Sequence, residues 1–126
     1  MIAFAAAALL AAGAGRAVAA GQPWVWSLYE NRASVTLAHE VPDTNALGAV
    51  LECAPGSGRV KVTVYPDGAT RPQDKLTAQL AVSDPAFKSF LTTGRLNVKH
   101  DEASASIVLP AADKPKLDRF SKLCGA

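Results

Sequence analysis

The chain has 126 residues, a formal net charge of +2 and a hydrophobic fraction of 49%. This length suits one domain. The sequence shows no repeat of about 20–50 residues, which would indicate a repeat array. The near balance of charge excludes the strong basic field that gathers nucleic acid or anionic lipid, so we expect no nucleic-acid partner.

Residues 1–19 have the pattern of a secretory signal peptide. Residues 2–12 form an apolar run, and residues 17–19 read AVA, an A-x-A cleavage site. No basic residue precedes the apolar run, which is a departure from the usual pattern. The alternative is an uncleaved membrane helix, but Arg16 and two glycines interrupt the run before it reaches the length of a span, about 20 residues. We expect cleavage after Ala19.

The mature protein is therefore expected to be a single β-rich domain, residues 20–126. Cleavage removes Arg16, one of the 13 basic residues, and none of the 11 acidic ones, so the formal net charge falls from +2 to +1. We expect this domain to be in the periplasm or secreted, with no stable insertion in the membrane.

The first half of the mature chain is predicted to form strands. Residues 24–29 (WVWSLY) and 33–39 (ASVTLAH) are the first two. Residues 49–53 (AVLEC) and 59–65 (RVKVTVY) follow, separated by a turn sequence, APGSG, and they make the clearest hairpin. Alternation places three valines of the second strand on a dry face and its polar residues on a wetter one.

The second half is predicted to mix strands and helices. Residues 75–82 alternate as a strand, and a short helix follows from Ser83 or Asp84 to the stop signal at Gly94. Residues 95–100 and 103–110 read as a further hairpin.

The last segment is predicted to be a helix with Asp113 as a candidate cap and Gly125 at its exit. Its apolar stripe comprises Leu117, Phe120, Leu123 and Cys124. The expected fold class is mainly β: a small antiparallel β-sandwich or sheet of six or seven strands, with one inserted short helix and a C-terminal helix packed on the sheet.

The only two cysteines, Cys53 and Cys124, are expected to form a disulfide. Exported chains fold where thiols are oxidised, and the spacing is not the C-x-x-C of a redox site. Cys53 shares a strand face with Leu51, so we expect it to lie in the core.

No convergent set of catalytic or metal-ligating residues is evident. The two histidines, His39 and His100, precede acids but lack the local spacing of a metal site, so we expect no metal and no cofactor. We expect both to lie half exposed at strand ends. GSG at residues 56–58 is a turn and not a nucleophile elbow, and it does not continue into a phosphate-binding loop. The carboxylate pairs, such as Glu30 with Glu40, are expected to be solvated.

Trp24, Trp26 and Tyr29 form a candidate partner surface. The two tryptophans share a strand face and are expected to be a core or core-edge pair. The alternative is that one of them belongs to an exposed patch that contacts a partner protein or a glycan.

Several short segments carry a resemblance to a group of proteins. They are WSL at residues 26–28, VLEC at 50–53, GRVKV at 58–62, TGRLNV at 93–98, IVLP at 107–110 and DRFSKLC at 118–124. The chain resembles small exported bacterial β-sandwich proteins of unknown function whose last helix carries a cysteine. Its layout is distantly similar to the envelope accessory proteins associated with type VI secretion. The resemblance implies the disulfide and no catalytic residue. The secretion-linked proteins often carry a lipid-accepting cysteine directly after the leader, and no cysteine stands at that place here, so lipid anchoring is not expected.

Two functions remain open from the sequence. The first is a non-enzymatic binding or structural module of the bacterial cell envelope, with another envelope protein as its partner. The alternative is a small metal-handling or inhibitor protein that uses His39, His100 or exposed loops.

Overall fold

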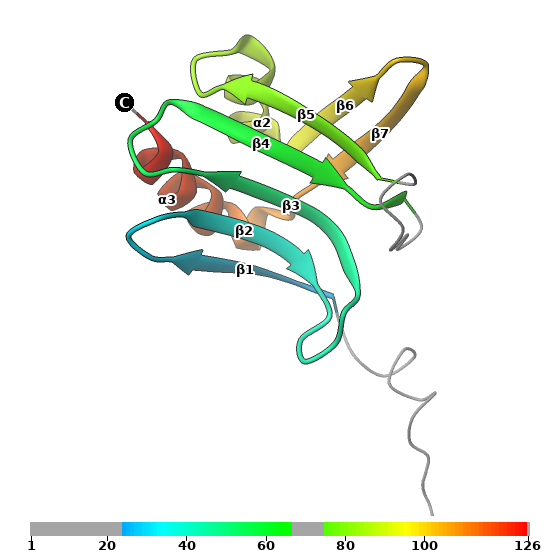
Figure 1. The fold of residues 1–126 in the computed structure, drawn as a ribbon, viewed down its shortest axis with the longest axis horizontal. Coiled ribbons are helices and arrows are strands. Elements are labelled where there is room, and N and C mark those ends of the chain that lie inside the picture. The colour runs from blue at the N-terminus through cyan, green and yellow to red at the C-terminus, as the bar shows by residue number, and fades with distance from the viewer. Residues whose placement is uncertain (1–23, 67–74, 126) are drawn as a thin grey trace, which may run out of the picture.

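The computed structural model describes residues 24–66 and 75–125, and the expected leader, residues 1–19, lies outside them. The described chain is mainly β, with seven antiparallel strands in two sheets and two α-helices (Figure 1). This confirms the predicted fold class. None of the helices in the described ranges is long and apolar enough to cross a membrane.

The first five strands form one antiparallel sheet in which each strand pairs with the next along the chain. They are β1 (Val25–Glu30), β2 (Val35–Glu40), β3 (Leu47–Cys53), β4 (Arg59–Val64) and β5 (Leu76–Ala81). The predicted hairpin is therefore present as β3 and β4. Arg59 and Lys61 are exposed and the three valines of β4 are buried, as the alternation predicts. Thr63 is buried on the polar face because Val50 and Thr77 flank it in the neighbouring strands.

The predicted short helix is α2 (Pro85–Thr93). An oxygen of the Asp84 side chain accepts a hydrogen bond from the Ala86 amide at 2.8 Å, which caps the first turn. Gly94 adopts the left-handed conformation at φ 76° and ends the helix.

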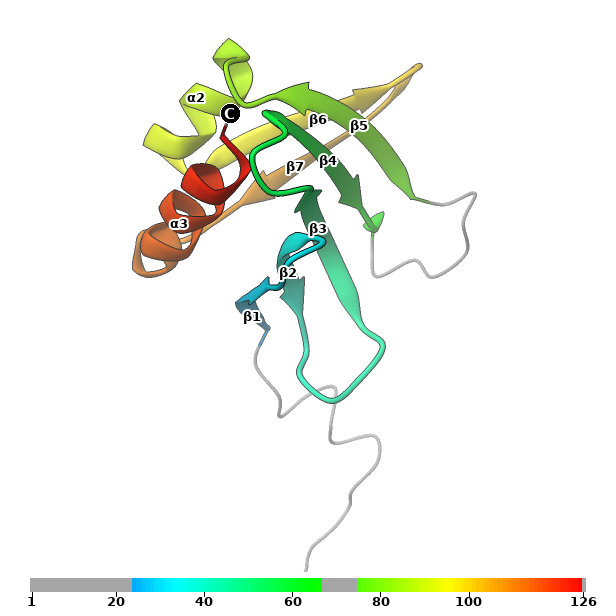
Figure 2. The same ribbon diagram turned by 60° about the vertical axis from the view of Figure 1, so that its left-hand side comes forward.

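Two further strands, β6 (Arg95–His100) and β7 (Ala103–Val108), form the second sheet, a hairpin with its turn at Asp101 and Glu102. Figures 1 and 2 show this hairpin beside β5, with β6 nearer to β5 than β7 is.

A 3-10 turn, η3 (Ala111–Asp113), leads into the last helix, α3 (Lys114–Cys124). Asp113 stands at the predicted cap position, but its side chain makes no capping hydrogen bond. The reason is that Asp113 belongs to the 3-10 turn and lacks the extended backbone of a cap, and its carboxylate accepts from Lys116 Nζ at 3.1 Å instead.

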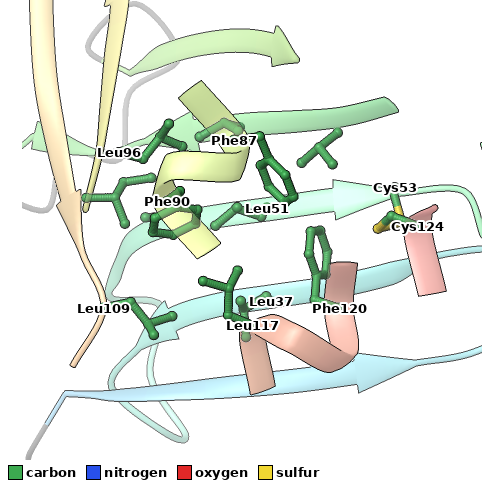
Figure 3. Close-up of a cluster of buried hydrophobic side chains, with 14 of the residues drawn as sticks. Leu37, Leu51, Cys53, Phe87, Phe90, Leu96, Leu109, Leu117, Phe120 and Cys124 are labelled. Carbon is green, nitrogen blue, oxygen red and sulfur yellow. A yellow bond between two sulfur atoms is a disulfide. The ribbon is translucent and has the colours of Figure 1, made fainter. Parts of the chain in front are cut away.

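The core lies between one face of the five-stranded sheet and a layer made by α2, α3 and the β6–β7 hairpin (Figure 3). The largest fully buried side chains include Phe87, Phe90, Leu117 and Phe120 from the helices and Leu37 and Leu51 from the sheet. The apolar stripe predicted for the last helix therefore faces the sheet. Leu123 packs at its margin.

A disulfide fastens the end of α3 to the sheet. Cys53 at the end of β3 is bonded to Cys124, with the two Cα atoms 5.8 Å apart and a separation of 71 positions in sequence. This confirms the predicted pair, and Figure 3 shows both sulfurs at the margin of the core.

The turn between β3 and β4 adds two backbone contacts to this fastening. The amides of Gly56 and Gly58 donate to the carbonyls of Leu123 at 2.8 Å and Cys124 at 2.7 Å. Both glycines have φ near 73°, a conformation that favours glycine, and it aims their amides at carbonyls that a helix end leaves without partners. The sequence of the turn therefore serves the helix as well as the hairpin.

Candidate binding cleft

Two tryptophans and a histidine meet at one end of the five-stranded sheet, and we call Trp24, Trp26 and His39 the aromatic cluster. Trp26 lies opposite His39 in the register of β1 and β2. Their rings stack with centroids 4.8 Å apart, and the Trp24 ring centroid is 5.1 Å from the imidazole. Trp26 is only 3% exposed, whereas Trp24 is 45% exposed. The cluster thus runs from the core to the surface.

Gly48 leaves the space that the imidazole occupies. The register of β2 and β3 shifts between His39 and Glu40, a bulge that pairs Glu40 with Leu47. A β-carbon at position 48 would lie 2.8 Å from His39 Nδ1, closer than such atoms approach in proteins. A side chain at this position would displace the imidazole.

A cleft of about 220 Å³ opens beside the aromatic cluster, between the two sheets. One wall comes from the first four strands and the other from β7; the lining residues are Trp26, His39, Gly48, Ala49, Val64, Ser106, Ile107 and Val108. No residue of β6 contributes, so the cleft lies on the side of β7 that faces away from β6. Val108 is 53% exposed at its rim. The cleft is therefore apolar, with an imidazole in one wall.

The indole of Trp26 carries an unpaired donor. Its Nε1 is buried, and no described residue accepts a hydrogen bond from it. A buried donor without an acceptor costs about 1–3 kcal/mol of stability. Such groups in native structures call for an explanation, and Trp26 is also a lining residue of the cleft.

Burial favours the neutral form of the His39 imidazole. Desolvation lowers its pKa from the ordinary value, and the carboxylate of Asp113 opposes this shift more weakly. A neutral imidazole offers one donor and one acceptor beside an apolar surface. The cleft can therefore hold an apolar group and one polar contact.

The three residues predicted as a partner surface do not form one patch. Trp24 and Trp26 belong to the aromatic cluster, whereas Tyr29 follows at an odd spacing along β1 and lies on the opposite face of the sheet. Tyr29 is 51% exposed, and its hydroxyl donates to the Glu40 carboxylate. That hydrogen bond raises the pKa of the Tyr29 phenol.

The other polar residues singled out by the sequence lie apart from the cleft. Arg119 binds Glu30 through two hydrogen bonds of 3.1 and 3.0 Å, and this contact lowers the pKa of the Glu30 carboxyl. Glu30 is therefore paired and not simply solvated. His100 is exposed near Asp101 at the tip of the β6–β7 hairpin, with Nε2 3.6 Å from the carboxylate.

Two further features bear on chemistry. Within residues 24–66 and 75–125, no three His, Cys, Asp or Glu side chains gather as a metal site would require. A larger hollow of about 350 Å³ lies at the β3–β4 end of the sheet, with Glu52, Arg59, Lys61 and Gln79 among its lining residues, but it is wide open to solvent.

Comparison of this chain with models of protein families, with curated proteins and with solved structures found no match. The geometry of the cleft is therefore the basis for a proposed function.

Sequence reasoning missed the place of His39 in the cluster. It placed His39 at a strand end and Trp26 in the core, and both placements are correct. What it lacked was the pairing register that sets these two residues opposite each other. The signal was the alternation along each strand, which puts Trp24 and Trp26 on one face of the first strand and His39 on the same face as the buried Val35 and Leu37 of the second.

Proposed function

We propose that this protein is a non-enzymatic binding module of the cell envelope, periplasmic or secreted, which binds its partner at the aromatic cleft. One observation carries the proposal: a tryptophan that is 45% exposed packs its ring 5.1 Å from the imidazole of His39, which lines a mainly apolar cleft of about 220 Å³. Exposed aromatic side chains beside a pocket are typical anchors of binding sites.

The chemistry of the cleft supports binding and not catalysis. His39 is the one titratable residue in its lining, and the Asp113 carboxylate that acts on it is not among the lining residues. Ser106 also lines the cleft, but its hydroxyl donates to Asn97 Oδ1 at 2.7 Å and is not paired with the imidazole. A general base with no nucleophile to activate supports no covalent mechanism.

The disulfide and the leader support the proposed location. A pair of cysteines joined across 71 residues is compatible with an oxidising compartment. The signal-peptide pattern of residues 1–19 indicates export to such a compartment.

Photo-crosslinking in the producing cell tests the proposal. A photoreactive phenylalanine analogue replaces Trp24 in one variant and Tyr29 in the other. The two native side chains are similarly exposed, at 45% and 51%, and they lie on the same strand but on opposite faces. We expect a discrete adduct at position 24 and none at position 29. Adducts of equal yield at both positions, or none at either, would contradict the proposal.

A further inference from the structure

The outer edge of β7 carries backbone groups that are free to bind another strand. The Leu109 amide donates to the Gly94 carbonyl at 2.7 Å, which makes this a hydrogen-bonded pair. Hydrogen-bonded and non-hydrogen-bonded pairs alternate along an antiparallel ladder. From the register of β6 and β7, Ile107 and Ala105 therefore bond to β6.

The residues that alternate with Ala105 and Ile107 turn their backbone groups the other way. Ser104, Ser106 and Val108 direct their amides and carbonyls away from β6. Among the described residues, β7 pairs only with β6, and no other backbone or side chain bonds to these groups. We call the backbone groups of Ser104, Ser106 and Val108 the open edge.

The cleft lies along this open edge. Ser106 and Val108 line it from β7, and Trp26 and His39 line it from the facing sheet. A strand that paired with the open edge would therefore run past the mouth of the cleft. Since successive side chains of a strand alternate between its two faces, every second side chain of that strand would face the aromatic cluster.

The charges around the hairpin indicate what the other side chains would be. On the face of the hairpin turned away from the core, β6 presents Arg95 and Lys99, both exposed, and no acid. The β7 residues on that face are neutral. This face favours acidic side chains in an added strand, although screening limits the attraction to a modest term.

We propose that β7 accepts an extended segment of a partner protein by strand addition, with an apolar residue of the segment in the aromatic cleft and acidic residues on the outer face. This inference rests on the proposed binding function and specifies its ligand. The open edge recognises the main chain of the segment, and the cleft selects an apolar side chain at alternate positions.

A library of displayed linear peptides provides the probe. Peptides of about ten residues suffice to pair with a strand of this length. Binders selected on the oxidised protein should alternate apolar and polar residues, with an excess of acids among the polar ones. A selected peptide, titrated against intrinsic tryptophan fluorescence, should slow hydrogen exchange at the amides of the open edge.

Two variants at one position separate the main chain from the side chain. Ser106→Pro removes the amide of the open edge, and proline is tolerated where an edge amide faces solvent. Ser106→Ala removes only the hydroxyl and its bond to Asn97. We expect Ser106→Pro to weaken the selected peptide about tenfold or more and Ser106→Ala to change its affinity less than about threefold.

Methylation of the peptide amides tests the same point without altering the protein, in case Ser106→Pro fails to fold. Methylation of every second peptide amide should abolish binding, and methylation of the amides between them should be tolerated. Equal effects of Ser106→Pro and Ser106→Ala in folded proteins, indifference to the methylated position, or a library without binders would each overturn strand addition.

Two further outcomes separate this inference from the proposed function. A crosslink at position 24, together with unslowed hydrogen exchange at the amides of the open edge, would support the binding module and overturn strand addition. Protection of the open edge that rises with protein concentration in the absence of peptide would show that a second copy of this chain occupies it, which would overturn the assignment to a partner.

Discussion

The two outer strands β1 and β7 differ in how their unpaired edges are treated. The Trp26 carbonyl of β1 points away from β2, and Lys116 Nζ of α3 donates to it at 2.6 Å. Arg119 of the same helix binds Glu30 at the other end of β1. The β7 edge has no such contact among the described residues. One helix therefore covers one edge, and nothing in the described chain covers the other.

The residue types of β7 also show that its edge is unprotected. Unpaired edges invite association with other chains, and proteins commonly protect them with lysine, proline or bulges. From Ala103 to Val108 the chain reads ASASIV, without a charge, a proline or a bulge. An unprotected edge beside an apolar cleft is what a strand-binding protein requires. The contrast fits the proposed strand addition, because α3 contacts the β1 edge and no described residue contacts the β7 edge.

Removal of the disulfide should have the largest effect on this contrast. Replacement of both Cys53 and Cys124 by serine should lower the free energy of unfolding by about 4 kcal/mol, from the closure of a loop of 71 residues. Because the disulfide holds the helix that covers β1, exchange at β1 amides should accelerate more than exchange at β7. Denaturant unfolding and hydrogen exchange measure both effects. Equal acceleration in the two strands would show that α3 does not protect the β1 edge.

Loss of Lys116 should leave the edge of β1 uncovered, as the edge of β7 is. Lys116→Ala removes the donor to the Trp26 carbonyl and the ion pair with Asp113, and should cost about 1 kcal/mol because the lysine is partly exposed. Exchange at β1 should rise, and sedimentation should reveal new self-association through the uncovered edge.

Lys114→Ala is the matched control for this variant. It removes an exposed ion pair with Asp118 on the same helix and touches neither edge. It should leave both readouts nearly unchanged. If the two lysine variants behave alike, the contact with Trp26 does not protect β1.

Acidification should have the smallest effect and should act on the cleft beside β7. Burial lowers the pKa of His39, so the unfolded chain takes up a proton, near pH 6.5, before the folded chain does. The contribution of neutral His39 is therefore complete above about pH 6.5, and the free energy of unfolding falls as the pH drops from there through the lowered pKa. Asp113 weakens this effect, and Lys116 holds that carboxylate.

Denaturant unfolding at several pH values measures this dependence. His39→Gln should flatten it in that window, while His100→Gln, at the exposed tip of the hairpin, should leave it in place. An unchanged dependence in His39→Gln would show that the imidazole is not the group that titrates.

Local sequence patterns were enough to predict most elements of the fold. The glycines between Cys53 and Arg59 marked the β3–β4 hairpin, and Asp84, Pro85 and Gly94 marked both ends of α2. These signals work because turns and caps require particular residues at particular backbone conformations. The disulfide followed from the count of cysteines and the expected oxidising compartment.

The cleft was not predictable in the same way. It depends on the bulge between His39 and Glu40, on the absence of a side chain at Gly48, and on where β7 passes the first sheet. Each of these is a long-range relation between segments far apart in the chain. Asp113 fails as a cap for a similar reason, since its carboxylate is engaged by Lys116 and its backbone continues a 3-10 turn.

The fastening of α3 to the β3–β4 turn has a consequence for how the molecule is made. The ribosome makes Cys53, Gly56 and Gly58 about seventy residues before it makes their partners. These partners are the sulfur of Cys124 and the carbonyls of Leu123 and Cys124. Until the last helix is made, the thiol of Cys53 and these two amides lack the partners that they have in the folded protein. Since Cys124 is the only other cysteine of the chain, the intramolecular disulfide can form only after the last helix has been made, and only then is that helix bonded to the end of β3.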